Sequence, residues 1–139
     1  MAVSFPVIGS TARRHVLLVD DFEDALEVWT MFFEASGYTV TTAGTAASAL
    51  ERAAMPSLDA VVLDLQLPDA SGLDVGRRLR ATRDGLALVA LTGRALTTDA
   101  TTELEAIFDA VLIKPCAPTD LLLAIERTIA TAQFEANAR

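Results

Sequence analysis

The chain has 139 residues, a net charge of −8 at pH 7, 52% hydrophobic residues and a single cysteine. This length fits about one domain, and the negative charge argues against nucleic acid as a partner, because proteins bind that polyanion by neutralising its phosphates with lysine and arginine. Much of the apolar content is alanine, and no apolar run approaches the ~18 residues that span a membrane, so the sequence predicts a soluble protein without a membrane partner.

The amino-terminal residues 1–13 are predicted to form a flexible extension. They lack the basic start and the long apolar centre of a secretory signal. The one cysteine, Cys116, cannot form an internal disulfide, which agrees with a reducing compartment. We therefore expect a cytoplasmic protein with a folded domain over residues 14–132 and a carboxyl-terminal tail over residues 133–139.

Short apolar, β-branched runs alternate with segments of helical periodicity along the rest of the chain. The first helix is predicted to bury Trp29 and to end at Gly37, since glycine often ends helices. Four arginines follow Gly72, at positions 77, 78, 80 and 83, and are interpreted as the solvated face of a helix. The expected strands cover about residues 15–20, 38–43, 58–64, 86–91 and 110–113, and the expected helices cover residues 22–36, 45–54, 72–82, 98–106 and 118–132.

This alternation predicts an α/β fold: a doubly wound, five-stranded parallel sheet with helices on both faces. The common flavodoxin-like strand order is 2-1-3-4-5, in which strands one and three become neighbours. Their carboxyl ends then form a crevice at one edge of the sheet. Any polar residues that end these two strands are expected to meet there.

Three carboxylates end those two strands. Asp20 and Asp21 follow the first apolar run, and Asp64 ends the third. Acids placed together beside apolar strands repel one another, so a bound cation is the simplest reason for the arrangement. Oxygen ligands in a crevice suit Mg²⁺, which uses one or two carboxylates and retains waters.

Two more polar residues end strands at the same edge. Thr92 follows the fourth strand, and Lys114, the only lysine in the chain, follows the fifth. Acids, a hydroxyl and an ammonium together are typical of a phosphoryl-transfer site, where catalysis depends on positioning and charge neutralisation. Asp64 is the best candidate nucleophile, because it lies alone at the centre of the strand ends.

The order and spacing of these motifs resemble the receiver domain of two-component response regulators. The resemblance covers about residues 14–132, and both a single-domain, chemotaxis-regulator-like protein and a receiver excised from a hybrid kinase fit it. Its motifs are Val19-Asp20-Asp21, Asp64-Leu65-Gln66-Leu67-Pro68-Asp69-Ala70-Ser71-Gly72, Leu91-Thr92-Gly93 and Lys114-Pro115.

The resemblance implies a role for each residue of the site. Asp64 would accept a phosphoryl group from a phosphohistidine of a partner histidine kinase or histidine phosphotransfer protein, while Thr92 and Lys114 would hold the phosphoryl oxygens. Mg²⁺ would be bound by Asp21, Asp64 and the backbone carbonyl of Gln66, with Asp20 assisting through water. The Lys114-Pro115 bond is a candidate cis peptide, as is usual in the family.

The chain also departs from the family pattern. Val111 occupies the switch position that is commonly aromatic, and Ile107 stands where a glycine commonly ends the fourth helix. We expect a weak or differently ended fourth helix, and a face of helix four, strand five and helix five that responds by loosening. Gln66 and Arg94 flank the path of an attacking water and are predicted to modulate the phosphoryl lifetime.

Other functional classes fit the sequence less well. A degenerate receiver that serves only as a protein-binding module would not need the intact acids, Thr92 and Lys114. A haloacid-dehalogenase-like phosphatase needs an acid two residues after its nucleophile, where this chain has Gln66, and a dinucleotide-binding domain needs a glycine-rich fingerprint after the first strand. We expect a signalling receiver that catalyses its own phosphorylation and dephosphorylation, has no conventional turnover substrate and acts by contact with a downstream target protein.

Overall fold

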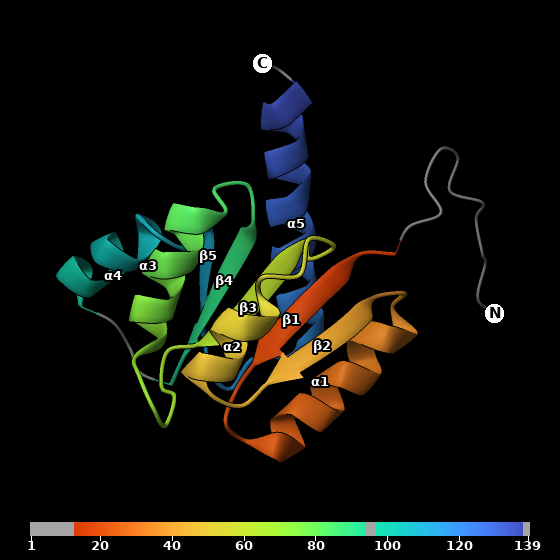
Figure 1. The fold of residues 1–139 in the computed structure, drawn as a ribbon, viewed down its shortest axis with the longest axis horizontal. Helices are drawn as coiled ribbons and strands as arrows, with labels where there is room; N and C mark the ends of the chain where they lie inside the picture. Colours follow the sequence, from red (N-terminus) through yellow and green to blue (C-terminus); the bar gives the residue numbers. More distant parts are fainter. Residues whose placement is uncertain (1–12, 94–96, 138–139) are drawn as a thin grey trace.

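The computed structural model describes residues 13–93 and 97–137 (Figure 1). In the described part of the chain, no helix is long and apolar enough to cross a membrane. The strands are β1 (His15–Val19), β2 (Thr39–Ala43), β3 (Ala60–Asp64), β4 (Ala87–Thr92) and β5 (Ala110–Ile113). The helices are α1 (Glu23–Ala35), α2 (Ala46–Arg52), α3 (Gly72–Thr82), α4 (Thr98–Glu105) and α5 (Pro118–Asn137).

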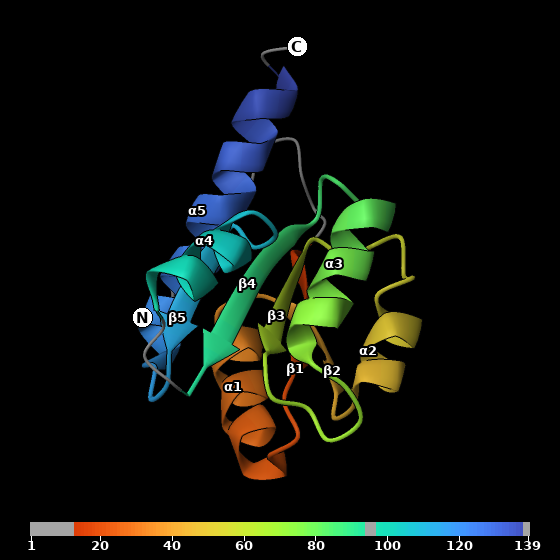
Figure 2. The same ribbon diagram turned by 90° about the vertical axis from the view of Figure 1, so that its left-hand side faces the viewer.

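The strands form one parallel sheet in the order β2-β1-β3-β4-β5. This confirms the predicted doubly wound fold and its strand order. Helices α1 and α5 pack on one face of the sheet, and α2, α3 and α4 pack on the other (Figure 2). Because both faces are covered, the central strands carry apolar side chains at nearly every position, as buried parallel strands do.

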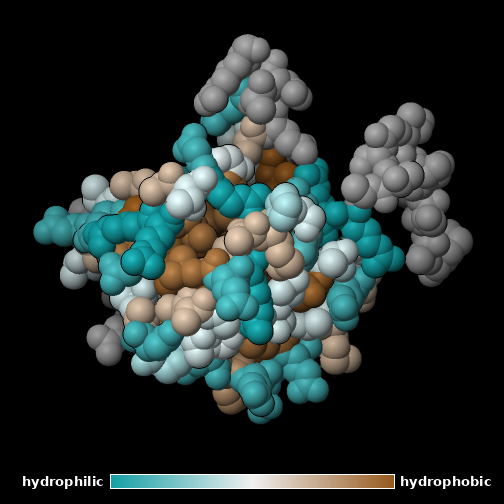
Figure 3. All heavy atoms as spheres, in the orientation of Figure 1, coloured by the Kyte–Doolittle hydropathy of each residue, from teal (hydrophilic) through white to brown (hydrophobic). Residues whose placement is uncertain are grey.

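The core is divided by the sheet into two apolar layers. Along β1, Leu17 and Val19 face one layer, while Val16 and Leu18 face the other. Trp29 of α1 is buried as predicted, at 8% exposure. On the face drawn in Figure 3, hydrophilic side chains cover most of the outer rim, and apolar side chains show mainly between them.

Helix α1 ends as the sequence predicts. Gly37 adopts a left-handed backbone with φ of 94°, a conformation that glycine tolerates without steric cost. Its N–H donates to the carbonyl of Glu34, and the N–H of Tyr38 donates to that of Phe33, both at 3.0 Å. These two bonds satisfy carbonyls in the last turn and direct the chain into β2.

The predicted end of the last helix at residue 132 is wrong, because α5 continues to Asn137. Its distal end projects beyond the sheet (Figures 1 and 2). The other boundaries differ from the predicted ones by no more than about two residues, which is the ordinary uncertainty of helix and strand ends.

Helix α4 ends without a left-handed residue, as the isoleucine at position 107 led us to expect. Ala106 keeps a right-handed helical backbone, and the N–H groups of Ile107 and Phe108 both donate to the carbonyl of Leu104. The phenyl ring of Phe108 is buried and lies against Gly76 of α3, where a Cβ would come within 2.4 Å of it. The α4–β5 turn therefore packs directly on α3.

Two of the four arginines do not form a solvated face, which corrects the sequence interpretation. Arg80 donates to the carbonyls of Asp84, Leu86 and Ile107 and to the carboxylate of Asp109, at 2.7–2.9 Å. Arg83 donates to three carbonyls of the α2–β3 connection, those of Ala53, Met55 and Leu58. Their aliphatic stems follow the protein surface while their guanidinium groups fix loops.

Candidate functional site

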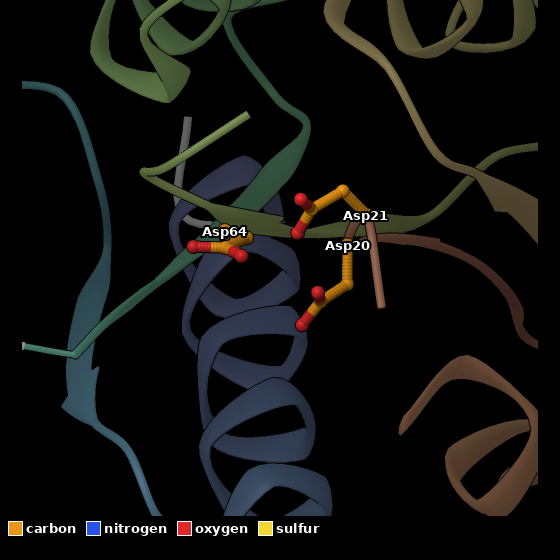
Figure 4. Close-up of side chains that lie close together, drawn as sticks. All are labelled: Asp20, Asp21 and Asp64. Atoms are coloured by element: carbon orange, nitrogen blue, oxygen red, sulfur yellow. The ribbon is translucent and has the colours of Figure 1, made fainter. Parts of the chain in front are cut away.

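The carboxyl ends of β1 and β3 bring together the three predicted acids. Val19 pairs with Leu63, so the residues that follow them, Asp20 and Asp64, lie on adjacent strands. One carboxylate oxygen from each of Asp20, Asp21 and Asp64 lies within 4.8 Å of the others (Figure 4). Asp20 and Asp64 are buried, at 1% and 4% exposure, whereas Asp21 is exposed.

Lys114 joins the two buried acids. Its Nζ donates to Oδ2 of Asp20 at 2.7 Å and to Oδ2 of Asp64 at 3.1 Å. Burial alone would lower the pKa of this ammonium, but its hydrogen bonds to the two carboxylates raise it above the usual value. The lysine therefore stays charged and offsets part of the repulsion between the acids.

The second oxygen of each buried acid is bound by the backbone. Oδ1 of Asp20 accepts the N–H of Phe22, and Oδ1 of Asp64 accepts the N–H of Gln66, both at 2.9 Å. Burial raises the pKa of Asp64, and the bonds from Gln66 and Lys114 oppose that rise. Each carboxylate is thus held in a fixed orientation by one local and one long-range donor.

The two remaining predicted residues end β4 and continue from β5. Thr92 is buried at the end of β4, one residue beyond the Leu91 that pairs with Asp64. The N–H of Lys114 donates to the carbonyl of Thr92 at 2.7 Å, which holds these two strand ends together. The Lys114-Pro115 peptide is cis, as predicted.

The donor set fits a hard divalent cation. Three carboxylates contribute −3 and Lys114 contributes +1, which leaves −2 at the site. Oxygen donors with this charge suit Mg²⁺, which favours carboxylates and waters over nitrogen or sulfur ligands. Gln66, whose carbonyl is the third predicted direct protein ligand beside Asp21 and Asp64, lies two residues after Asp64 and pairs with Ser71 in an isolated antiparallel bridge.

Two other described residues, His15 and Val111, lie away from these acids. His15 lies at the opposite end of β1, where its ring nitrogens contact the hydroxyls of Ser57 and Thr41 at 2.9 and 2.7 Å. Val111 is half-buried in β5, away from the acids in sequence and strand position. Arg94 lies outside the described residues, so its predicted modulating role stays a prediction.

Two residues around the site received no role in the sequence interpretation, although both stand in the motif that begins at Asp64. Asp69 binds the backbone of α2 through both carboxylate oxygens. Gly72 approaches the backbone of Asp64 so closely that a Cβ would lie 2.3 Å from its carbonyl oxygen. The signal available in the sequence was their place in this motif after Pro68, where a glycine and an acid suit a tight loop and the start of a helix.

Comparison with known proteins gives one consistent family. The response regulator receiver domain matches residues 16–126 of the chain. The probable transcriptional regulatory protein TcrX of Mycobacterium tuberculosis is 38% identical over 108 residues, which cover 78% of this chain and 46% of that protein. The response regulator MprA of Mycobacterium ulcerans is 35% identical over 120 residues, covering 86% and 52%. The chain spans about half the length of these curated relatives.

Solved structures agree with the sequence matches. A CheY-like response regulator receiver domain protein from Methanospirillum hungatei is 28% identical with a TM-score of 0.82, covering 89% of this chain and 99% of that one. A response regulator protein from Burkholderia pseudomallei with a phosphorylated aspartic acid, calcium ion and citrate is 26% identical with a TM-score of 0.75, covering 88% and 72%. With its doubly wound sheet and its acids at the ends of β1 and β3, the chain belongs to the response regulator receiver domain family of two-component signalling.

Proposed function

We propose that this protein is a phosphorylatable receiver in two-component or phosphorelay signal transduction, and that Asp64 is its phosphoacceptor. The observation that carries the proposal is the ammonium of Lys114 shared between Asp20 and Asp64 beside a third acid. The donor is a phosphohistidine of a partner histidine kinase or histidine phosphotransfer protein. The chain's own histidine, His15, is buried at the other end of β1 and cannot reach Asp64.

The proposed transfer is an in-line displacement at phosphorus. A carboxylate oxygen of Asp64 attacks, an acyl phosphate P–O bond forms, and the P–N bond to the donor imidazole breaks, returning its electron pair to the ring nitrogen. Thr92 ends the neighbouring strand β4 and Lys114 follows β5, where a hydroxyl and an ammonium can hold the phosphoryl oxygens. The hydrogen bond from Gln66 N–H keeps Asp64 oriented for attack.

The proposed cation is Mg²⁺, bound by Asp21, Asp64 and the carbonyl of Gln66, with Asp20 acting through water. When bound, Mg²⁺ supplies positive charge that neutralises the transferring phosphoryl group. The net charge of −2 at the site supports this assignment. The Burkholderia pseudomallei relative, with its phosphorylated aspartic acid and calcium ion, supports a site of the same chemistry here.

Output is proposed to occur by contact with a downstream target protein in the cytoplasm, through the receiver domain over residues 14–132. With Val111 at the switch position, the face of α4, β5 and α5 would respond by loosening. Hydrogen exchange over residues 98–105, with and without phosphorylation, tests this: protection is expected to fall on phosphorylation, and equal protection in the two states would contradict the loosening model.

Gln66 and Arg94 are proposed to tune the lifetime of the acyl phosphate, so Arg94→Ala is expected to change the dephosphorylation half-life.

The phosphoacceptor assignment is tested by incubating the protein with Mg²⁺ and acetyl phosphate and measuring its intact mass. The wild type is expected to gain one phosphoryl group, which Asp64→Asn does not. The matched control is Asp84→Asn, which changes an exposed acid in the turn before β4 and is expected to behave as the wild type. Absence of the adduct in the wild type under every condition would overturn the proposal and favour a degenerate receiver that acts only as a protein-binding module.

A further inference from the structure

Asp69 connects the loop that follows the phosphoacceptor strand to the first turn of α2. Its Oδ1 accepts the N–H of Ala46 at 2.7 Å, and its Oδ2 accepts the N–H of Ala47 at 3.0 Å. The next N–H of this turn, that of Ser48, is accepted by Oγ1 of Thr45 at 3.1 Å. Asp69 therefore completes the cap of a helix that is 22 and 23 residues away in the sequence at the two contacts.

The loop that carries Asp69, residues 65–71, is closed at its base. The N–H of Gly72 donates to the carbonyl of Leu65 at 3.0 Å, and Gln66 pairs with Ser71. A loop closed in this way moves as a unit, so the anchor at its tip also determines where its first residues lie. Among those is Gln66, whose N–H orients Asp64 and whose carbonyl is a proposed Mg²⁺ ligand.

The helix that Asp69 binds is itself connected to the acidic site. Ala43, the last residue of β2, precedes α2 closely in sequence, and its carbonyl accepts the N–H of Asp20 at 3.1 Å. Lys114 then joins Asp20 to Asp64 on the far side. Asp69 thus closes a ring of contacts around the site, which runs from Asp20 through α2 and the loop to Asp64 and back through Lys114.

We propose that Asp69 is a positioning residue for Mg²⁺: by anchoring loop 65–71 to α2, it holds the carbonyl of Gln66 where the cation needs it. This inference rests on the proposed function. Removing the anchor leaves every ligand in the chain but frees the loop, and the loss of partners that orient metal ligands usually weakens affinity by 10–100-fold. Because the loop keeps its closed base, we expect a loss at the low end, about tenfold.

Isothermal titration calorimetry with MgCl₂ measures this directly on the full chain. Asp69→Ala is expected to raise the Kd for Mg²⁺ about tenfold, and Asp69→Asn, which retains one acceptor oxygen, is expected to fall between it and the wild type. Asp84→Ala removes an exposed acid from a turn at the opposite edge of the sheet and should leave the Kd unchanged. If circular dichroism shows that Asp69→Ala does not fold, Asp69→Asn decides, because its isosteric side chain preserves the packing of the fold while it lacks one of the two acceptor oxygens that anchor the loop.

Phosphorylation by acetyl phosphate at increasing Mg²⁺ separates positioning from a general loss of activity. For Asp69→Ala, the half-saturating Mg²⁺ concentration should rise about tenfold, while the rate at saturating Mg²⁺ stays within about twofold of the wild type. A Kd equal to that of Asp84→Ala, or an unchanged Kd with a reduced saturating rate, overturns the positioning role while the wild-type adduct on Asp64 still supports the proposed function. A wild type that neither binds Mg²⁺ nor forms the adduct overturns both.

Discussion

Gly72, the first residue of α3, lies where any side chain would collide with the backbone at the end of β3 and the start of the loop after it. A Cβ on this residue would lie 2.3 Å from the carbonyl oxygen of Asp64 and 2.6 Å from the Cα of Leu65. Real Cβ atoms almost never approach another atom more closely than 3.0 Å, so Gly72→Ala must separate α3 from β3 by at least 0.7 Å (3.0 minus 2.3 Å). Backbone atoms on both sides make this separation costly.

The free-energy cost follows from the overlap. Forcing extra volume into a packed region typically costs about 1–3 kcal/mol, and because the overlap here is with backbone atoms we expect the upper part of that range, about 2–3 kcal/mol. The better helix propensity of alanine returns about 1 kcal/mol. We therefore expect Gly72→Ala to lower the free energy of unfolding by about 1–2 kcal/mol. With a urea m-value of about 2 kcal/mol/M, the unfolding midpoint should fall by about 0.5–1 M.

Urea unfolding followed by the fluorescence of Trp29, the only tryptophan and a buried residue, measures this change. Gly85→Ala is the matched control, because no atom lies within 4 Å of the Cβ position at Gly85. Its stability should stay within about 0.5 kcal/mol of the wild type. Equal midpoints for the two variants would refute the reasoning, since the close approach at Gly72 would then impose no constraint.

Three further predictions concern charge. Arg80→Ala should destabilise the fold by about 2–3 kcal/mol in urea unfolding, because four acceptors lose a charged donor, whereas the exposed Arg78→Ala should stay within about 0.5 kcal/mol. Burial raises the pKa of Asp64 in the folded, metal-free protein above its usual value of 3.8. The protonated side chain therefore stabilises the fold below pH 3.8, and this stabilisation is lost as the pH rises through the raised pKa. The melting temperature of the wild type, measured as a function of pH, should show this loss, and the same pH dependence in Asp64→Asn would contradict the prediction. Burial and the nearby Glu126 raise the pKa of Tyr38, the single tyrosine, to about 12. The pKa can be measured by following tyrosine absorbance against pH, and a measured value of the usual 10.0 would disprove this prediction.

The sequence was sufficient for the fold and for most of the site. Apolar runs separated by helical segments determine the strand order, and that order alone places Asp20, Asp64 and Lys114 at one edge of the sheet. The periodicity of apolar side chains can be read within short segments, and the alternation of strands and helices then indicates the strand order. This is why the sequence predicted that residues 94 and 50 positions apart lie at one edge of the sheet, although it did not predict the ion pairs of Lys114 with Asp20 and Asp64.

The contacts that could not be predicted lie between loops. The bonds from Ala46 and Ala47 to Asp69, and those from Arg80 to the α4–β5 turn, depend on how two connections meet in space. The periodicity of the sequence does not indicate contacts between loops. An arginine on a helix also occupies the same kind of position in the sequence whether its guanidinium group binds water or backbone carbonyls. The end of α5 was missed because its apolar period fades after residue 132, while residues such as alanine, glutamine and glutamate continue the helix.

The shared ammonium of Lys114 also makes the site depend on the completeness of the folded chain. Its Nζ binds Asp20, which lies 94 residues earlier in the sequence. The positive charge that offsets the two buried acids is therefore placed only when the end of the last strand, β5, has folded. Before β5 is in place, Asp20 and Asp64 would repel each other at adjacent strand ends with nothing between them. A chain in which β5 and Lys114 have not yet folded into place therefore lacks the arrangement that we propose for phosphoryl transfer.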